Sequence, residues 1–74
     1  MARTLDTLGI GESAAVLRLT AEDGMRRRLA SMGFVAGQRV TCLMRSFLGD
    51  PAAYRILGAV VALRRGDARK ILII

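Results

Sequence analysis

Residues 25–33, Met-Arg-Arg-Arg-Leu-Ala-Ser-Met-Gly, decide the fold that the sequence predicts. Met25, Leu29 and Met32 stand at i, i+4 and i+7, which places their side chains on one face of an α-helix. Gly33 follows directly, and glycine is typical of a helix end because it adopts a positive φ without steric cost. The segment therefore predicts one short helix with a single apolar face.

The residues just before this segment indicate where the helix begins. Thr20 can accept a hydrogen bond from a free backbone N–H, and Asp23, three residues later, completes the spacing of a capping box. Glu22 and Asp23 also suit the positive end of the helix dipole. We therefore expect Thr20 to cap the helix.

Strand patterns lie on both sides of the helix. Residues 13–19 alternate in polarity, and residues 38–45 do so again after a turn at Gly37. The expected core faces are Ala15, Leu17 and Leu19 in the first strand, and Val40, Cys42 and Met44 in the second. A lone cysteine in such a face is expected to be an inert core thiol.

Three further strands complete the chain after a loop. A strand over residues 52–57 is expected to point Tyr54 and Ile56 into the core. Residues 58–59, Gly-Ala, suit a two-residue hairpin turn with glycine first. The remaining segments are a strand over 60–64, a helical turn over 65–70 and a last strand over 71–74.

This order of elements predicts a mainly β fold. A single helix between the first two strands is too little for a parallel sheet, whose connections each need a long crossover. Five short strands suit a small, strongly bent antiparallel barrel. We expect residues 1–74 to form one domain of this kind, with the α-helix between strands 1 and 2 and the short helical turn before the last strand.

The composition supports a small aliphatic core. Hydrophobic residues make up 53% of the 74 residues, and aromatic residues only 4%. The longest apolar stretch, residues 56–63, is far shorter than the ~20 residues that span a bilayer, and the first residues lack the apolar region of a signal peptide. We therefore expect a cytoplasmic protein with no direct insertion into a membrane.

The sequence offers little catalytic or metal-binding chemistry. It has no histidine and one cysteine, so neither a Ser/His/Asp or Cys/His catalytic set nor the usual Cys/His zinc site can form within one chain. The carboxylates are scattered along the sequence, and Glu22 and Asp23 are better explained by the start of the helix. We predict no enzyme activity, no cofactor and no intrinsic metal site.

Several short motifs, in a fixed order, carry a family resemblance. They are Leu5, Gly11 and Val16; Arg28-Leu29 and Met32-Gly33-Phe34; Gly37 and Val40; Leu48-Gly49-Asp50-Pro51; and Leu63-Arg64, Asp67-Ala68, Ile71 and Ile73. With these motifs the chain resembles the FeoA family over nearly its whole length. These are small SH3-like domains that accompany FeoB, a membrane ferrous-iron transporter with a cytoplasmic GTPase domain. Ala36 and Ser46-Phe47 depart from the family pattern, which commonly has Pro and Ala-Pro there.

The resemblance implies an SH3-like fold and an accessory role in ferrous iron uptake, through binding to the cytoplasmic part of a FeoB-like transporter. Iron is then cargo of the transporter and not a ligand of this chain. Modulation of the partner's GTP hydrolysis is an alternative. Nucleic-acid binding is another, since small barrels often bind strands, although the few aromatic residues make base stacking a weak expectation.

The loop between the second and third strands is the first candidate contact site. Gly49, Asp50 and Pro51 predict a turn, in which Asp50 bonds backbone N–H groups and Pro51 fixes φ. Such a turn places Phe47 and Leu48 either on an exposed recognition surface or against the end of the barrel.

Charge indicates a second candidate site. Twelve Lys and Arg against six Asp and Glu give a net charge of +6. The run Arg26, Arg27 and Arg28 on the expected helix can form a solvated face, or one of these arginines can act on a phosphate of a partner GTPase in trans. Arg26 and Arg27 are the predicted contact residues, which can steer the protein toward an acidic partner. The apolar tail at residues 71–74 can pair edge to edge with another chain, so a homo-oligomer stays open.

Overall fold

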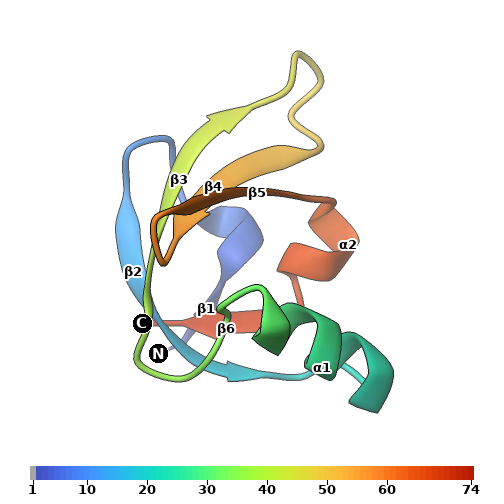
Figure 1. Cartoon of the computed structure of the whole chain (residues 1–74). Helices are drawn as coiled ribbons and strands as arrows, with labels where there is room; N and C mark the ends of the chain where they lie inside the picture. Colours follow the sequence, from blue (N-terminus) through green and yellow to red (C-terminus); the bar gives the residue numbers. More distant parts are fainter. Residues whose placement is uncertain (1) are drawn as a thin grey trace.

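One antiparallel sheet of six strands with two α-helices makes up the fold in the computed structural model, which describes residues 2–74 (Figure 1). Along the chain the elements are β1 (Arg3–Thr4), the 3-10 helix η1 (Leu5–Thr7), β2 (Ser13–Leu19), α1 (Asp23–Ser31), β3 (Arg39–Arg45), β4 (Ala52–Ile56), β5 (Ala59–Leu63), α2 (Arg65–Ala68) and β6 (Ile71–Ile73). Their order across the sheet is β1-β6-β2-β3-β4-β5. The mainly β class and the positions of both helices are confirmed.

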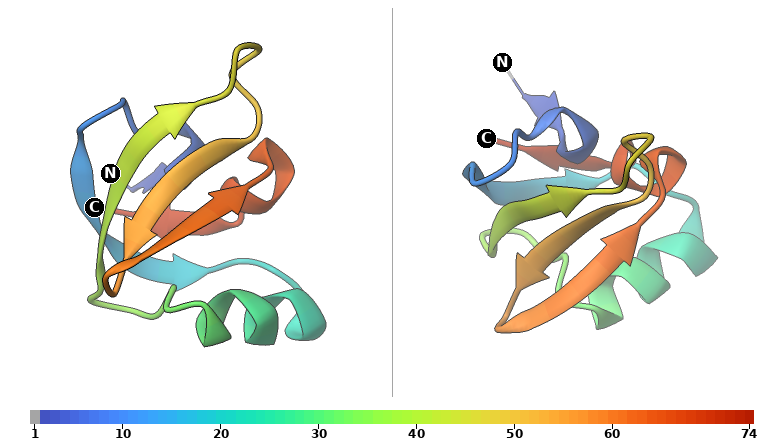
Figure 2. Two further views of the ribbon diagram at one scale, coloured as in Figure 1. Left: turned by 45° about the horizontal axis from the view of Figure 1, so that its top comes forward. Right: turned by 90° about the horizontal axis from the view of Figure 1, so that it is seen from above.

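The number of strands and the closure of the sheet differ from the prediction. Six strands form and not five, because β1 contributes two residues, which are too few to show any alternation in the sequence. The sheet curls strongly (Figure 2), yet β1 and β5 remain its two edges and do not pair with each other. The fold is therefore a bent, open sheet and not a closed five-stranded barrel.

The last strand, β6, lies inside the sheet. It pairs with β1 on one side and with β2 on the other, and Ile73 faces both Arg3 and Val16 across these ladders. Its nearly continuous apolar sequence fits an internal position, where Ile71 and Ile73 are fully buried. The expectation that the tail offers a free edge to another chain is therefore wrong.

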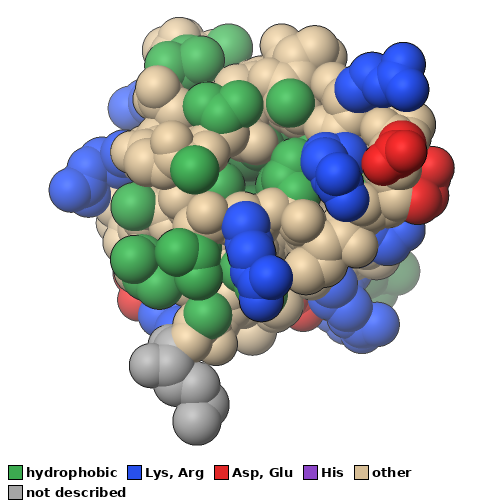
Figure 3. Space-filling view, turned by 90° about the horizontal axis from the view of Figure 1, so that it is seen from below, with side chains coloured by type: hydrophobic (Ala, Val, Ile, Leu, Met, Phe, Trp, Pro, Cys, Tyr) green, Lys and Arg blue, Asp and Glu red, His purple; other side chains and the backbone are tan. Residues whose placement is uncertain are grey.

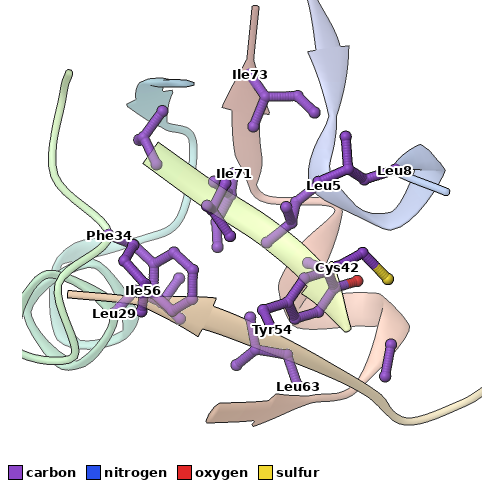
Figure 4. Close-up of a cluster of buried hydrophobic side chains, with 14 of the residues drawn as sticks. Leu5, Leu8, Leu29, Phe34, Cys42, Tyr54, Ile56, Leu63, Ile71 and Ile73 are labelled. Atoms are coloured by element: carbon purple, nitrogen blue, oxygen red, sulfur yellow. The ribbon is translucent and has the colours of Figure 1, made fainter. Parts of the chain in front are cut away.

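The core is aliphatic with two aromatic side chains, Phe34 and Tyr54, both buried (Figure 4). Leucines from η1 and α1 and isoleucines from β4 and β6 fill the space between them. Cys42 is buried as expected, and Tyr54 and Ile56 point into the core as the alternation of their strand predicts. The largest buried side chains are Tyr54, Phe34, Leu5, Leu8, Leu29, Ile56, Ile71, Ile73, Val40 and Cys42.

Two register shifts overturn part of the expected faces of β2 and β3, although Val40 and Cys42 are buried as predicted. In β2, Val16 is the buried residue and Leu17 is 38% exposed, and the pairing with β6 shifts between Val16 and Arg18. In β3, the pairing with β4 shifts between Cys42 and Met44, and Met44 is exposed. Such an irregularity breaks the two-residue period, so strict alternation assigns these side chains to the wrong face.

Helix α1 begins two residues later than a Thr20 cap implies. Glu22 is the N-cap, and its carboxylate accepts hydrogen bonds from the backbone N–H groups of Gly24 at 3.0 Å and Met25 at 2.8 Å. The backbone N–H of Thr20 instead donates to the carbonyl of Lys70, at 2.8 Å. Neither helix in the described part of the chain has the length and apolarity needed to cross a membrane.

The apolar face of α1 covers the core. Leu29 is fully buried, and Met25 and Met32 are half-buried against the same cluster. Gly33 ends the helix with a φ of +109°, and a Cβ at this position would stand 2.9 Å from Cδ1 of Leu57. The positive φ therefore favours glycine here, and a Cβ would also have to displace the flexible, exposed side chain of Leu57.

The β4–β5 turn lies one residue earlier than predicted. Leu57 and Gly58 occupy it with φ values of 52° and 78°, and Ile56 pairs with Ala59 across it. Positive φ at both central residues is the conformation that favours the twist of a two-residue hairpin. The sequence does not predict this turn, because leucine rarely adopts a positive φ.

Candidate partner-docking surface

The β3–β4 loop is closed by its own backbone. Ser46 donates its N–H to the carbonyl of Pro51 at 3.0 Å, and Gly49 donates its N–H to the carbonyl of Ser46 at 2.8 Å. Gly49 has a φ of +85°, and the Asp50–Pro51 peptide bond is cis. The two backbone hydrogen bonds give the loop a defined turn at the outer end of the hairpin.

A contact with α2 holds the loop from the side. Oδ1 of Asp50 accepts a hydrogen bond from the backbone N–H of Arg65, the first residue of α2, at 2.9 Å. The guanidinium of Arg65 also lies beside Gly49, where an added Cβ would stand 3.6 Å from Nη2. The turn is therefore anchored both to its own strands and to a separate helix.

Phe47 and Leu48 project from this anchored turn into solvent. Phe47 is 100% exposed and Leu48 is 83% exposed. The alternative that they pack against the end of the sheet is therefore wrong. Figure 1 shows the β3–β4 loop extending beyond the sheet at the top of the molecule, and the second view of the same ribbon agrees (Figure 2). We call Phe47 and Leu48 the apolar tip.

Arginine side chains stand near the base of the apolar tip. Arg64 and Arg65 are exposed at the start of α2. Arg45, at the end of β3, is half-buried, and its Nη2 donates to the carbonyl oxygens of Asp6, at 2.9 Å, and Leu8. Arg45 therefore fastens η1 to the hairpin, whereas Arg64 and Arg65 leave positive charge on the surface beside the tip.

No motif in the sequence connects the α2 arginines with the loop. Arg65 lies 15 residues from Asp50 along the chain, and no local pattern reports that separation. The available signal was Asp50 itself, since a turn aspartate commonly accepts from a backbone N–H. Its partner is set by the tertiary fold, which only the structure shows.

Arg26 and Arg27 lie far from the apolar tip. Figure 1 shows α1 at the opposite end of the molecule from the β3–β4 loop. Arg26 donates to the carbonyl of Ala21 at 3.1 Å and forms an ion pair with Asp23 at 3.6 Å. Within residues 2–74, Arg27 is exposed and has no hydrogen bond or ion pair through its side chain. The predicted contact residues therefore form two separate surfaces.

The carboxylates serve local structure. Glu12 pairs with Arg3 at 3.0 Å and accepts from the N–H of Gly9 at 2.8 Å, and these bonds lower the pKa of Glu12. The backbone N–H groups at the start of α1 lower the pKa of Glu22. Asp67 of α2 pairs with Arg28 of α1 at 3.2 Å. Over the described residues, the carboxylates and Cys42 form no group of three or more that could hold a metal ion.

The α1 end of the molecule presents a different surface. Figure 3 views it from below, with separate groups of hydrophobic side chains and more Lys and Arg side chains than acidic ones. The ion pair of Arg28 with Asp67 links α1 to α2 across this region. This end therefore offers a mixed, basic surface and no continuous apolar face.

The family model and a curated relative point to the same family. The model of the FeoA domain matches residues 3–74. A protein from Porphyromonas gingivalis, named Fe(2+) transport protein A/Fe(2+) transporter FeoB fusion protein, is 40% identical over 67 residues, which cover 90% of this chain. Those residues make up only 8% of that fusion protein.

Solved structures match the whole fold. The solution structure of the FeoA protein from Chlorobium tepidum has a TM-score of 0.88 and 34% identity, and the match covers 97% of this chain and 70% of that one. Stenotrophomonas maltophilia FeoA, solved with zinc and described as an SH3 domain protein, has a TM-score of 0.88 and 29% identity, covering 97% and 89%. The expected SH3-like fold is confirmed, and the chain belongs to the FeoA domain family.

Proposed function

We propose that this protein supports ferrous iron uptake as an accessory protein that binds the cytoplasmic part of a FeoB-like transporter. The fused relative from Porphyromonas gingivalis supports a partnership, because one chain there carries both names. Binding to the cytoplasmic part of a transporter is also consistent with the cytoplasmic location that the sequence predicts. The protein acts through the surface it presents and not through chemistry of its own.

The exposure of the apolar tip is the observation that carries this proposal. Two large apolar side chains, Phe47 and Leu48, stand in water at an anchored turn. A few buried apolar anchors supply most of the binding free energy in protein complexes. Because the turn is already ordered, little conformational entropy is lost when it docks. The tip therefore fits an apolar pocket on the partner.

Charge complements the apolar tip. The chain carries a net charge of +6, and Arg64 and Arg65 expose positive charge near the loop. Surface charge of this kind speeds encounter with a partner of opposite sign and selects against basic partners. We therefore propose that the partner's docking pocket has an acidic rim.

The aromatic side chains favour a protein partner over a nucleic acid. Single-stranded nucleic acids bind through several aromatic rings that stack on successive bases. Phe34 and Tyr54 are buried in the core, which leaves Phe47 as the exposed ring. A lone exposed ring beside a leucine suits an apolar pocket better than a series of bases.

Pull-down of a FeoB cytoplasmic domain by this protein tests the proposal. We expect the wild-type protein to capture the domain and Leu48→Asp to lose it. Leu57→Asp is the matched control, because Leu57 is 64% exposed and lies at the other end of β4. Iron uptake in a strain that lacks its own FeoA protein gives the second readout. Failure of both capture and complementation by the wild type would overturn the proposal.

The same complex decides whether the protein also modulates GTP hydrolysis. Turnover of GTP by the FeoB cytoplasmic domain is measured with and without saturating protein. A change that Arg27→Ala abolishes, with binding intact, assigns that role to the unpaired arginine of α1. An unchanged turnover removes the regulatory alternative and leaves docking as the function.

A further inference from the structure

The strand β5 forms an open edge of the sheet. It pairs with β4 alone, from Ala59 opposite Ile56 to Leu63 opposite Ala52, and Figure 2 shows it as the outermost strand of the curled sheet. Native edge strands usually carry a charge, a proline or a bulge that prevents pairing with other chains. Within β5 there is no charge, no proline and no register shift against β4. Its backbone is therefore open to a further strand.

The register of the β4–β5 hairpin identifies the backbone groups that face outward. Ala59 and Ile56 close the two-residue turn as a hydrogen-bonded pair. Hydrogen-bonded and non-hydrogen-bonded pairs alternate along antiparallel strands, so the backbone groups of Val61 also bond to β4. The N–H and C=O groups of Val60 and Ala62 therefore point toward the open edge.

Arg64 continues the outward row of side chains beyond the end of the strand. Val60 and Ala62 are exposed on the outer face of the sheet, whereas Leu63 is buried. Arg64 follows Leu63 with an extended backbone, at φ −71° and ψ 152°, so its exposed side chain alternates back to the outer face. Its carbonyl accepts hydrogen bonds from N–H groups of α2, which ends the open edge there.

A second arginine stands beside the same edge. Arg55 lies opposite Val60 on the adjacent strand β4, and its side chain is exposed, as is that of Arg64. Within residues 2–74, neither arginine side chain makes a hydrogen bond or an ion pair. The sequence has no Asp or Glu from position 51 to position 66. The edge therefore carries positive charge that is not neutralised by this segment of the chain.

The carboxylates that flank this segment are engaged elsewhere. Asp50 accepts the backbone N–H of Arg65 at 2.9 Å, and Asp67 pairs with Arg28 of α1 at 3.2 Å. A second copy of the chain is a poor occupant of the edge, because each copy has a net charge of +6 and like charges repel. Charge complementarity instead favours an acidic strand.

We propose that the β5 edge binds an extended acidic segment of another protein, which joins the sheet as an antiparallel strand of alternating acidic and apolar residues. Parallel pairing is slightly less stable. Acidic residues of the segment stand opposite Val60, Ala62 and Arg64 on the outer face. Apolar residues stand beside Val61, which is partly buried against the core. The added strand thus supplies backbone hydrogen bonds, apolar contacts and ion pairs together.

Both arginines reach acidic side chains of such a strand. A residue directly opposite Arg64 has its Cβ about 5 Å from that of Arg64, which is close enough for an ion pair. Arg55 is two strand spacings, about 10 Å, from the added strand. An extended arginine and an extended glutamate bridge this gap together across Val60. The outer face therefore selects an acidic strand over a basic one.

Backbone-methylated peptides separate strand addition from general attraction between charges. The probe is acetyl-Glu-Val-Glu-Val-Glu-Val-Glu-amide, added to the full chain. In the antiparallel arrangement the glutamates form the hydrogen-bonded pairs with Val60 and Ala62. We expect methylation of the glutamate nitrogens to abolish binding and methylation of the valine nitrogens to preserve it. Equal binding of the two methylated peptides, or the reverse order, would overturn the proposal.

Charge reversal tests the role of Arg64. We expect Arg64→Glu to weaken binding of the unmethylated peptide by roughly three- to tenfold. The matched control is Arg18→Glu, which changes the net charge equally at an exposed position of β2, a strand inside the sheet. Equal weakening by the two variants would mean unspecific attraction and contradict the proposal. Leu48→Asp, at the apolar tip, should bind the peptide as wild type does, which separates this surface from transporter docking.

NMR titration of the full chain with the peptide gives the affinity and the site. We expect the amides of Val60 and Ala62 to become protected from exchange on peptide addition, and the affinity to fall as salt screens the attraction. Thermal melts establish that the variants fold. No binding up to about 1 mM peptide, protection confined to other strands, or equal affinity for a peptide with lysine in place of glutamate would overturn the proposal.

Discussion

Asp50 and Arg65, 15 residues apart in the chain, meet in a hydrogen bond of 2.9 Å from the backbone N–H of Arg65 to the carboxylate of Asp50. This bond ties the β3–β4 loop to α2 and orders the apolar tip before any partner arrives. Because Asp50 acts through the loop, its removal should affect docking more than folding.

Replacing Asp50 separates these two effects. We expect Asp50→Ala to lower the free energy of unfolding by about 1 kcal/mol, the net value of one exposed hydrogen bond. Transporter binding should weaken as well, because the loop must then be ordered on docking. Asp50→Asn keeps an acceptor oxygen, so this variant should retain most of the free energy of unfolding and most of the affinity for the transporter. Stability is measured by urea unfolding, and affinity by a binding assay. If the Asn and Ala variants lose equal amounts of stability and of affinity, the hydrogen bond of Asp50 is not the cause of these losses.

The β4–β5 turn offers a stabilising substitution. Leu57 holds a φ of 52°, a conformation that asparagine tolerates much better than leucine. With Gly58 next in the chain, Leu57→Asn creates the Asn-Gly pair preferred in such turns. We expect the free energy of unfolding to rise by about 0.5–1 kcal/mol, measured by urea unfolding. A fall in stability would mean that the contact of Leu57 with the end of α1 outweighs the backbone strain.

Glu22 makes the free energy of unfolding depend on pH in the acid range. Its pKa is lowered from 4.5 by the backbone N–H groups of Met25 and Gly24, so its stabilising contribution is present above 4.5 and is lost as pH falls through the lowered pKa. We expect Glu22→Gln to be less stable than wild type at neutral pH and to lose less stability on acidification. Thr20→Val, at the residue that does not cap the helix, should leave the acid limb of the stability profile unchanged.

Tyr54 makes the free energy of unfolding depend on pH in the alkaline range. Burial raises the pKa of Tyr54 above its ordinary value of 10.0, so the folded state holds the phenol proton more tightly than the unfolded state. The resulting stability is complete below pH 10.0 and declines as pH rises through the raised pKa. Tyr54→Phe should show a smaller loss of unfolding free energy between about pH 8 and pH 11. An equal loss in both proteins would show that Tyr54 is not the cause of the alkaline effect.

The parts of the fold that sequence predicts best are those with local causes. The end of α1 at Gly33 follows from the preference of glycine for positive φ, and the burial of Leu29 follows from helical spacing. Both features of α1 depend on neighbours within a few residues. For the β3–β4 loop, turn chemistry leaves two positions of Phe47 and Leu48 open, and the structure shows the exposed one.

The features that sequence could not give depend on distant partners. Whether Val16 or Leu17 faces the core depends on a register shift against β6, and Met44 turns outward through a shift against β4. Thr20 fails to cap α1 because its backbone is bonded to Lys70, 50 residues away. Each of these outcomes is set by strand pairing and not by the local pattern.

The affinity of a FeoB cytoplasmic domain for this protein tests the docking of the apolar tip most directly. Phe47→Ser and Leu48→Asp alter side chains that are fully or mostly exposed, so each should change the free energy of unfolding by less than about 0.5 kcal/mol. By titration calorimetry we expect both to weaken binding by roughly tenfold or more, while Leu57→Asp binds as wild type does. Wild-type affinity in the Phe47 and Leu48 variants, with their fold intact, would contradict the account.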